Sequence, residues 1–215
     1  MSNELTPNTA MPPVPGSVEQ TGKTNINVTN QDGGVVNINY NFQNGSVANS
    51  AEQMMAVQAF SKEYYQLLVT CEEDVFKDNL VTVTASRALS QYLVPPEILE
   101  RCSSLSDEGI KELKTFPAII CRENTEMKGT TDPNQCAVYG YITKVKKEGR
   151  NIKVAFHPIG SIRQSILCEK KYAIYFDLDM DCAITDLNHS AWSVHKANLF
   201  EAFKEAGITY LPTPV

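Results

Sequence analysis

The stretch Thr24-Asn-Ile-Asn-Val-Thr-Asn-Gln-Asp-Gly-Gly-Val-Val-Asn-Ile-Asn-Tyr-Asn-Phe42 decides the architecture of the N-terminal part of this chain. Apolar residues alternate with asparagines on both sides of Asp32-Gly33-Gly34, so a period of two surrounds a turn signal. The pattern predicts a β-hairpin. A three-residue loop over Asp32-Gly33-Gly34 sets Val28 opposite Ile38, which places all the apolar side chains on one face.

An isolated hairpin is marginally stable in water, so this apolar face needs a partner. We favour self-association into a β-prism or short β-solenoid stem, with a trimer as the favoured homo-oligomer, because asparagine ladders suit stacked strands. The alternative is a hairpin that packs on its own domain. The residues expected to form the contact between copies are Ile26, Val28, Val36, Ile38, Tyr40 and Phe42.

The hairpin and its turn, residues 24–45, lie between two segments of different character. Residues 1–23 are rich in proline and small polar residues and are expected to form a disordered leader. Residues 50–69 are expected to form a helix capped by Ser50, which could extend a bundle of stems. The stripe that predicts this helix consists of Met54, Val57, Phe60, Tyr64 and Leu68.

Residues 70–215 are expected to form an α+β binding domain with a central antiparallel hairpin or a small barrel. The hairpin is predicted from residues 137–145 and 152–156, which flank a polar turn. The other predicted strands are 80–84, 116–121, 172–176 and 191–194, and the predicted helical segments are 86–93, 106–114, 160–168 and 199–206.

The composition excludes several classes of protein. The 215 residues are 42% hydrophobic and carry a net charge of −6, which argues against nucleic-acid binding by bulk charge but leaves a local basic patch open. We find neither a membrane-length apolar run nor a signal-peptide pattern and therefore expect a cytoplasmic protein without membrane contact. The six cysteines form no C-x-x-C pair, so we expect them to act as small buried hydrophobic residues. We expect the protein to bind neither a metal nor another cofactor.

The run Asp177-Leu-Asp-Met-Asp181 is the main candidate for chemistry. It differs from the haloacid-dehalogenase pattern at its third acidic position, and too little chain follows it for that fold. It also lacks the glycine and the final glutamate of a calcium loop. We favour the interpretation that these acids lie at a solvated strand end and point outward, and we assign no catalytic residues. A metal-dependent hydrolase that uses Asp177, Asp179 and Asp181 is kept as an alternative.

The most basic segment is Lys144 to Arg150. Basic residues beside aromatic ones can bind an acidic protein, an anionic nucleotide or single-stranded nucleic acid, although charged hairpin tips more often serve solubility. The residues expected to bind a partner here are Tyr139, Tyr141, Lys144, Lys146, Lys147, Arg150 and Lys153. Farther along, Trp192 is expected in the core and His195 at the surface.

Two segments resemble parts of known bacterial proteins. The asparagine-rich run 25–42 resembles stem prefixes that precede effector or sensor domains in anti-phage and related conflict systems, and residues 191–208 resemble the end of an uncharacterised module in such proteins. The resemblance implies a cytoplasmic, multimeric accessory or sensor component, and it includes no catalytic signature.

Three hypotheses for function follow. The favoured one is a non-enzymatic assembly and binding protein, in which the hairpin gathers copies and the domain binds a protein partner. The second is a sensor of a small anion or nucleotide at Lys144 to Lys153. The third is the hydrolase described above.

Overall fold

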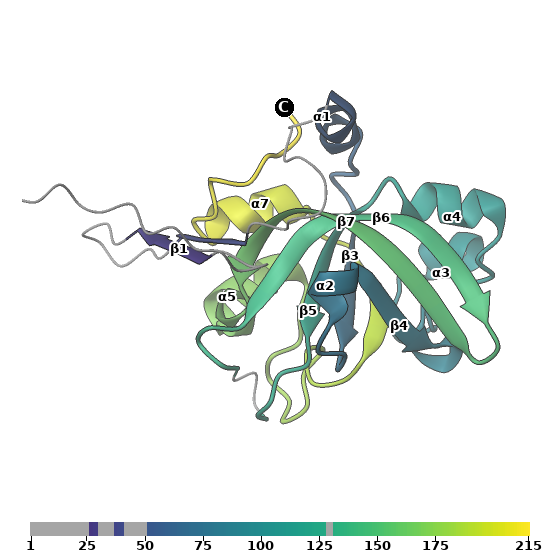
Figure 1. The fold of residues 1–215 in the computed structure, drawn as a ribbon. Helices are drawn as coiled ribbons and strands as arrows, with labels where there is room; N and C mark the ends of the chain where they lie inside the picture. Colours follow the sequence, from purple (N-terminus) through teal and green to yellow (C-terminus); the bar gives the residue numbers. More distant parts are fainter. Residues whose placement is uncertain (1–25, 30–36, 41–50, 128–130) are drawn as a thin grey trace, which may run out of the picture.

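The computed structural model describes residues 26–29, 37–40, 51–127 and 131–215. A six-stranded mixed sheet runs through the body and is covered by helices on both faces (Figure 1). Its strands are β3 (Tyr65–Thr70), β4 (Leu80–Thr84), β5 (Pro117–Arg122), β6 (Cys136–Glu148), β7 (Asn151–Arg163) and β8 (Ala191–His195).

The helices around the sheet are short. They are α1 (Ala51–Gln58), α2 (Val75–Asp78), α3 (Pro96–Cys102), α4 (Asp107–Leu113), α5 (Ser165–Cys168), α6 (Lys170–Ala173) and α7 (Leu199–Glu205), with 3₁₀ turns η1 (Ala85–Arg87) and η2 (Ile174–Phe176). Two predicted caps are confirmed: Ser106 Oγ accepts a hydrogen bond from the Gly109 amide, and Asn198 Oδ1 accepts from the Phe200 amide. No helix in the described part of the chain is long and apolar enough to cross a bilayer.

The sheet has the order β4-β7-β6-β5-β3-β8. Neighbouring strands are antiparallel, except that β3 and β5 are parallel. The parallel pair is joined by a long crossover that carries β4 and helices α2 to α4. The mixed α and β character and the central antiparallel hairpin, now β6–β7, are both confirmed.

The sheet curls until the chain beyond one edge reaches the other edge. Ala88, just after β4 and η1, forms a parallel bridge with Trp192 of β8, and the Leu89 amide donates to the Trp192 carbonyl at 2.8 Å. Trp192 is fully buried, as expected of a core anchor, and its indole N–H donates to Gln66 Oε1. The result is a strongly curved sheet, open in its strand order, with a tryptophan where its two edges approach.

Each face of the sheet carries its own apolar core. Leu67 of β3 points to one core, which is covered by α1, α5, α6, α7 and the C-terminal residues. Leu68 points to the other, which lies inside the curl against α3 and α4. Strand β3 is buried along its whole length, so both cores pack against it.

The predicted helix over residues 50–69 is wrong in its second half. Helix α1 ends at Gln58, and Tyr65–Thr70 forms β3. A strand buried on both faces lacks the polar–apolar alternation that marks a half-exposed strand, so its apolar residues also fit a helical stripe at three- and four-residue spacing. Tyr64 and Leu68, assigned to that stripe, lie before and within the strand.

Two further segments differ from the prediction. Residues 172–176 belong to α6 and η2 and do not form a strand, and Ile174 and Tyr175 are exposed. Residues 86–93 contain only the end of η1, because Leu89 is hydrogen-bonded to β8. Of the cysteines, three are buried as expected, Cys168 is half-buried, and Cys71 and Cys182 are exposed.

The N-terminal strands are β1 (Ile26–Thr29) and β2 (Asn37–Tyr40), paired antiparallel. Val28 lies opposite Ile38 and Ile26 opposite Tyr40, which is the register that a three-residue loop requires. Strand β2 also approaches β7 of the same chain. The expected leader, the turn, Val36 and Phe42 lie outside the described residues.

Candidate functional site

The tyrosines and the basic residues assigned to one partner surface lie in different places. Tyr139 is fully buried, packs edge-on against Phe203, and donates its hydroxyl to the Pro212 carbonyl. Tyr141 is half-buried between Phe60 and His157. Both tyrosines therefore belong to the base of the β6–β7 hairpin, and Tyr139 cannot stack on a ligand as expected.

The basic residues occupy the far half of the same hairpin, which we call the basic tip: Lys144, Lys146, Lys147, Arg150 and Lys153. Glu148 lies among them and pairs with Lys146 at 2.6 Å and Lys153 at 2.8 Å. These hydrogen bonds, first from Lys146 and then from Lys153, lower the pKa of Glu148 to about 2. The basic tip is thus partly neutralised by its own strand.

The acidic run divides between two surroundings. Asp181 is exposed and pairs with Lys170, which lowers the pKa of its carboxyl group. Asp177 and Asp179 instead lie beside Asp186, whose Oδ2 accepts a hydrogen bond from the Asp179 amide at 3.0 Å. These acids follow a 3₁₀ turn, and the strand expected before them is absent from the described residues.

A cleft of about 540 Å³ lies beside β8, and we call it the β8 cleft. One wall is the segment after Leu89, the other is η2 and the acidic run, and β8 supplies the floor. Its lining residues are Gln91, Tyr92, Leu93, Val94, Pro95, Ile174, Asp177, Leu178, Asp179, Asp186, Ser193, Val194 and His195. The volume falls within the range of about 300–1,000 Å³ that is usual for ligand pockets.

A chain of polar contacts fixes the floor of the β8 cleft. Ser193 Oγ lies 2.9 Å from His195 Nε2, and His195 Nδ1 lies 2.9 Å from the main-chain carbonyl oxygen of Asp177. The imidazole stacks on Tyr65 with ring centroids 5.2 Å apart. Tyr65 donates its hydroxyl to the Phe176 carbonyl at 2.6 Å, and burial raises its pKa well above the usual value. The floor is therefore tied to the strand and to the acidic wall.

The contact between Ser193 and His195 has the spacing of a nucleophile and its base, but its surroundings are structural. Ser193 is only 6% exposed, and its Oγ also lies 3.3 Å from the Leu67 carbonyl oxygen of the neighbouring strand. The side chain of His195 is 11% exposed, which corrects the expected surface histidine. We conclude that this pair holds the acidic wall against β8.

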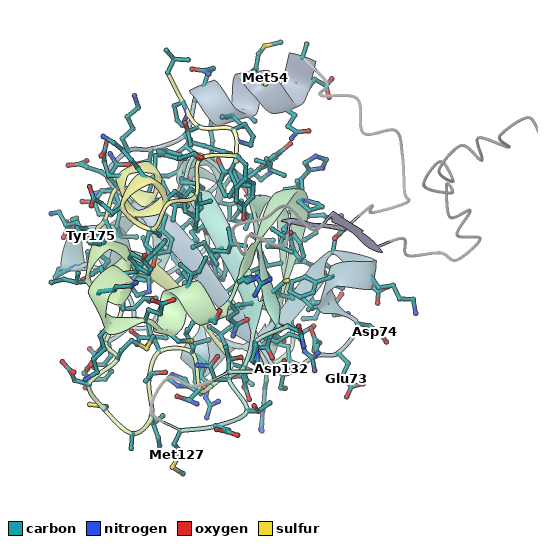
Figure 2. The ribbon with its side chains drawn as sticks, turned by 90° about the vertical axis from the view of Figure 1, so that its left-hand side faces the viewer. Met54, Glu73, Asp74, Met127, Asp132 and Tyr175 are labelled. Carbon is teal, nitrogen blue, oxygen red and sulfur yellow. The ribbon has the colours of Figure 1, made fainter. Side chains whose placement is uncertain are left out.

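The rim of the β8 cleft combines carboxylates with exposed apolar side chains. Within the described residues its lining includes three aspartates and neither lysine nor arginine. Tyr92 is 87% exposed and Ile174 is 75% exposed, while Tyr175 beside Ile174 also projects at the surface (Figure 2). Such a rim can hold a cationic group and the apolar groups next to it.

The same acids do not form a metal centre in the described part of the chain, where no three or more histidine, cysteine, aspartate or glutamate side chains converge in a geometry for an ion. Asp181 is turned to Lys170, away from the lining of the β8 cleft. The Asp181 amide donates to Asp179 Oδ1 at 2.9 Å, but the carboxylates of the three acids in the hydrolase alternative do not converge on a common point in the described residues.

Sequence reasoning missed Tyr92, Asp186, Ser193 and His195 as members of one site. One local signal was available: Ser193 lies on the predicted strand 191–194, and His195, two residues later, shares its face once the strand extends to His195 as β8 does. Nothing local shows that residues 91–95 and 177–186 flank that strand, because this follows from the curl of the sheet.

Comparison of the chain with protein-family models, with curated proteins and with solved structures finds no match. The resemblance to bacterial conflict proteins therefore stays a prediction.

Proposed function

We propose that this protein is a non-enzymatic, multimeric binding module, an accessory or sensor component in which the N-terminal hairpin gathers copies and the folded domain binds a protein partner. The observation that carries the proposal is the β8 cleft with its exposed apolar rim. It offers a partner a preformed hollow of about 540 Å³ with large side chains at its mouth.

The rim supports a protein partner. Tyr92 and Ile174 are large apolar side chains that remain in water on the isolated domain. Exposed apolar groups that cluster around a hollow mark interaction sites, and tyrosine is among the residues that contribute most to binding energy at interfaces. A partner that covers them removes apolar surface from water and so gains free energy.

The floor supports a role in binding over one in chemistry. The Ser193 hydroxyl lies at the floor of the β8 cleft, between the His195 ring and the Leu67 carbonyl, and the residue is only 6% exposed. A nucleophile has to meet a substrate carbonyl at about 3–3.5 Å in an aligned geometry, and the two contacts already hold this hydroxyl against the neighbouring strand.

The proposed assembly rests on the hairpin and on α1. The register of β1 and β2 pairs the apolar positions 26, 28, 38 and 40 with one another. Helix α1 follows and buries only Val57 among its own residues, while Met54 and Met55 are 46% and 65% exposed (Figure 2). Helix α1 therefore retains exposed apolar residues for a contact between copies. Several linked copies would raise avidity for a multivalent partner without any new contact.

The test is the mass of the full chain in solution, measured by multi-angle light scattering, with two matched variants. Ile38→Asp places a charge at an apolar hairpin position, and Asn39→Asp places the same charge at the neighbouring polar position. We expect an oligomer, favoured as a trimer, for the wild type and for Asn39→Asp, and a monomer for Ile38→Asp. A wild-type monomer would instead fit a hairpin packed on its own domain, where β2 approaches β7.

A further inference from the structure

We propose that the β8 cleft recognises an arginine side chain of a partner protein, presented between apolar residues. The inference rests on the proposed function and names the chemistry of its partner. It is carried by charge complementarity within a formed hollow, together with an aromatic ring at the mouth of that hollow.

The charge of the β8 cleft is one-sided. Asp177 and Asp179 come from one wall, and Asp186 lies beside them through its hydrogen bond to the Asp179 amide. The lining includes no lysine or arginine among the described residues, and the nearby Lys170 pairs with Asp181, which does not line the hollow. The Asp177 side chain is 60% exposed, and its nearest cationic candidate is His195 at 3.7 Å, a group charged only when protonated. A cation that enters therefore meets carboxylates without a competing fixed cation in the lining.

The ring of Tyr92 favours a guanidinium group over an ammonium group. Tyr92 lines the same hollow as the three aspartates and is 87% exposed. A guanidinium group is planar, stacks on aromatic faces and presents a fork of N–H donors to carboxylates. An ammonium group is a compact, strongly hydrated charge that gains less from this combination.

The other lining residues supply the apolar surroundings of that arginine. Leu93, Val94 and Pro95 form one wall, and Ile174 and Leu178 belong to the other. Because Leu178 is buried and Ile174 is 75% exposed, the apolar surface extends from the interior of the hollow to its rim. Apolar residues on both sides of the arginine would cover this surface, which a free guanidinium compound cannot do.

The carboxylates are held in place before a partner arrives. The Asp177 main chain is fastened to His195, and the Asp179 amide to Asp186. The opposite wall is fixed to β8, since the Val194 amide donates to the Leu93 carbonyl at 3.0 Å. Walls that are already ordered reduce the entropy lost on binding.

The experiment measures the binding of two short peptides to the full chain by fluorescence anisotropy. The probes are fluorescein-labelled Gly-Leu-Arg-Leu-amide and the same peptide with citrulline, the neutral isostere, in place of arginine. We expect the arginine peptide to bind at least about tenfold more tightly than the citrulline peptide. We also expect its affinity to fall as salt rises, because exposed charges are screened.

Matched variants locate the binding. Asp177→Asn, Asp179→Asn and Asp186→Asn together should weaken the arginine peptide about tenfold, whereas Asp181→Asn, outside the β8 cleft, should change its affinity less than about twofold. Asparagine keeps the size of each side chain and one accepting oxygen, and it tolerates the left-handed backbone of Asp177, with φ at 55°. Circular dichroism and the melting temperature are measured for each variant as a control for folding. Tyr92→Ala should weaken the arginine peptide more than the citrulline peptide.

Three outcomes would overturn the inference, and they differ in what they leave standing. Equal binding of the two peptides, lost in both with Ile174→Asp, rejects arginine but keeps the β8 cleft as a docking site. Equal effects of the triple variant and Asp181→Asn, or no binding of either peptide, reject the site, and the mass measurement then judges the proposed assembly separately. Competition by agmatine that is as strong as the unlabelled arginine peptide rejects a partner protein in favour of a small cation.

Discussion

The basic tip and the β8 cleft both gather charge, but only the basic tip holds a residue of opposite fixed charge among its members. In the basic tip, five cationic residues lie within ten positions of one another, and Glu148 in their midst pairs with two of them. In the β8 cleft, Asp177, Asp179 and Asp186 line a hollow without lysine or arginine among its described lining residues. Charge density along a sequence is therefore a weaker guide to a binding site than charge that the fold leaves facing a hollow.

We expect the largest loss of stability from a substitution at Gly140, in the base of the β6–β7 hairpin. A Cβ atom at Gly140 would lie 2.1 Å from the His157 carbonyl oxygen, a main-chain atom that cannot move freely. Gly140→Ala should therefore lower the free energy of unfolding by about 3 kcal/mol, measured by urea denaturation.

The matched variant is Gly149→Ala at the turn. This position has nothing within 4 Å of a Cβ but a φ of +60°, so the cost should be about 1 kcal/mol and come from backbone strain alone. Equal losses of unfolding free energy in the two variants would contradict the view that the base of the hairpin is tightly packed and its turn is open.

The next prediction tests the floor of the β8 cleft. Ser193→Ala removes the hydroxyl that links His195 to the Leu67 carbonyl, and should lower the free energy of unfolding by about 1–2 kcal/mol. Ser86→Ala, at an exposed serine, should change it by less than about 0.5 kcal/mol. Covalent labelling of Ser193 by a fluorophosphonate would show that Ser193 is a reactive nucleophile. This result would contradict a purely structural role for Ser193 and His195.

A smaller effect concerns the pH dependence of the basic tip. The pKa of Glu148 is lowered from 4.5 to about 2 by hydrogen bonds from Lys146 and Lys153. A lowered folded-state pKa contributes stability that is present above pH 4.5 and is lost as the pH falls toward 2. Carboxyl titration followed by NMR should place the midpoint of Glu148 near pH 2, and Glu148→Gln should remove this contribution to acid sensitivity. A midpoint near 4.5 would mean that the two ion pairs do not persist in solution.

The basic tip and the β8 cleft should also differ in how a single change of charge alters binding to a polyanion. Glu148→Gln and Asp179→Asn each raise the net charge by one, the first in the basic tip and the second in the β8 cleft. We expect Glu148→Gln to raise the salt concentration that elutes the protein from immobilised heparin, and Asp179→Asn to leave it nearly unchanged, because screening limits the reach of a charge to about 8–10 Å. Equal shifts would show that only net charge matters, and that the basic tip is no distinct surface.

Local patterns predicted the parts of this fold that local interactions determine. Neighbouring residues along the chain determine the helix caps at Ser106 and Asn198. The same is true of the long hairpin at 137–156, whose strands flank a short polar turn. Tyr65–Thr70 was assigned to a helix because burial on both faces removes the alternation that marks a strand. The β8 cleft was not predictable, since it needs Ala88 to reach Trp192 across the curled sheet, a contact between segments about a hundred residues apart.

We propose that the N-terminal segment gathers copies of a domain that folds on its own. It is tested most directly by light scattering on the full chain and on a chain that starts at Ser46, which retains α1 and both apolar cores. We predict a defined oligomer for the full chain and a folded monomer for the shortened one. Monomers in both cases would contradict the account, because the hairpin would then pack on its own domain.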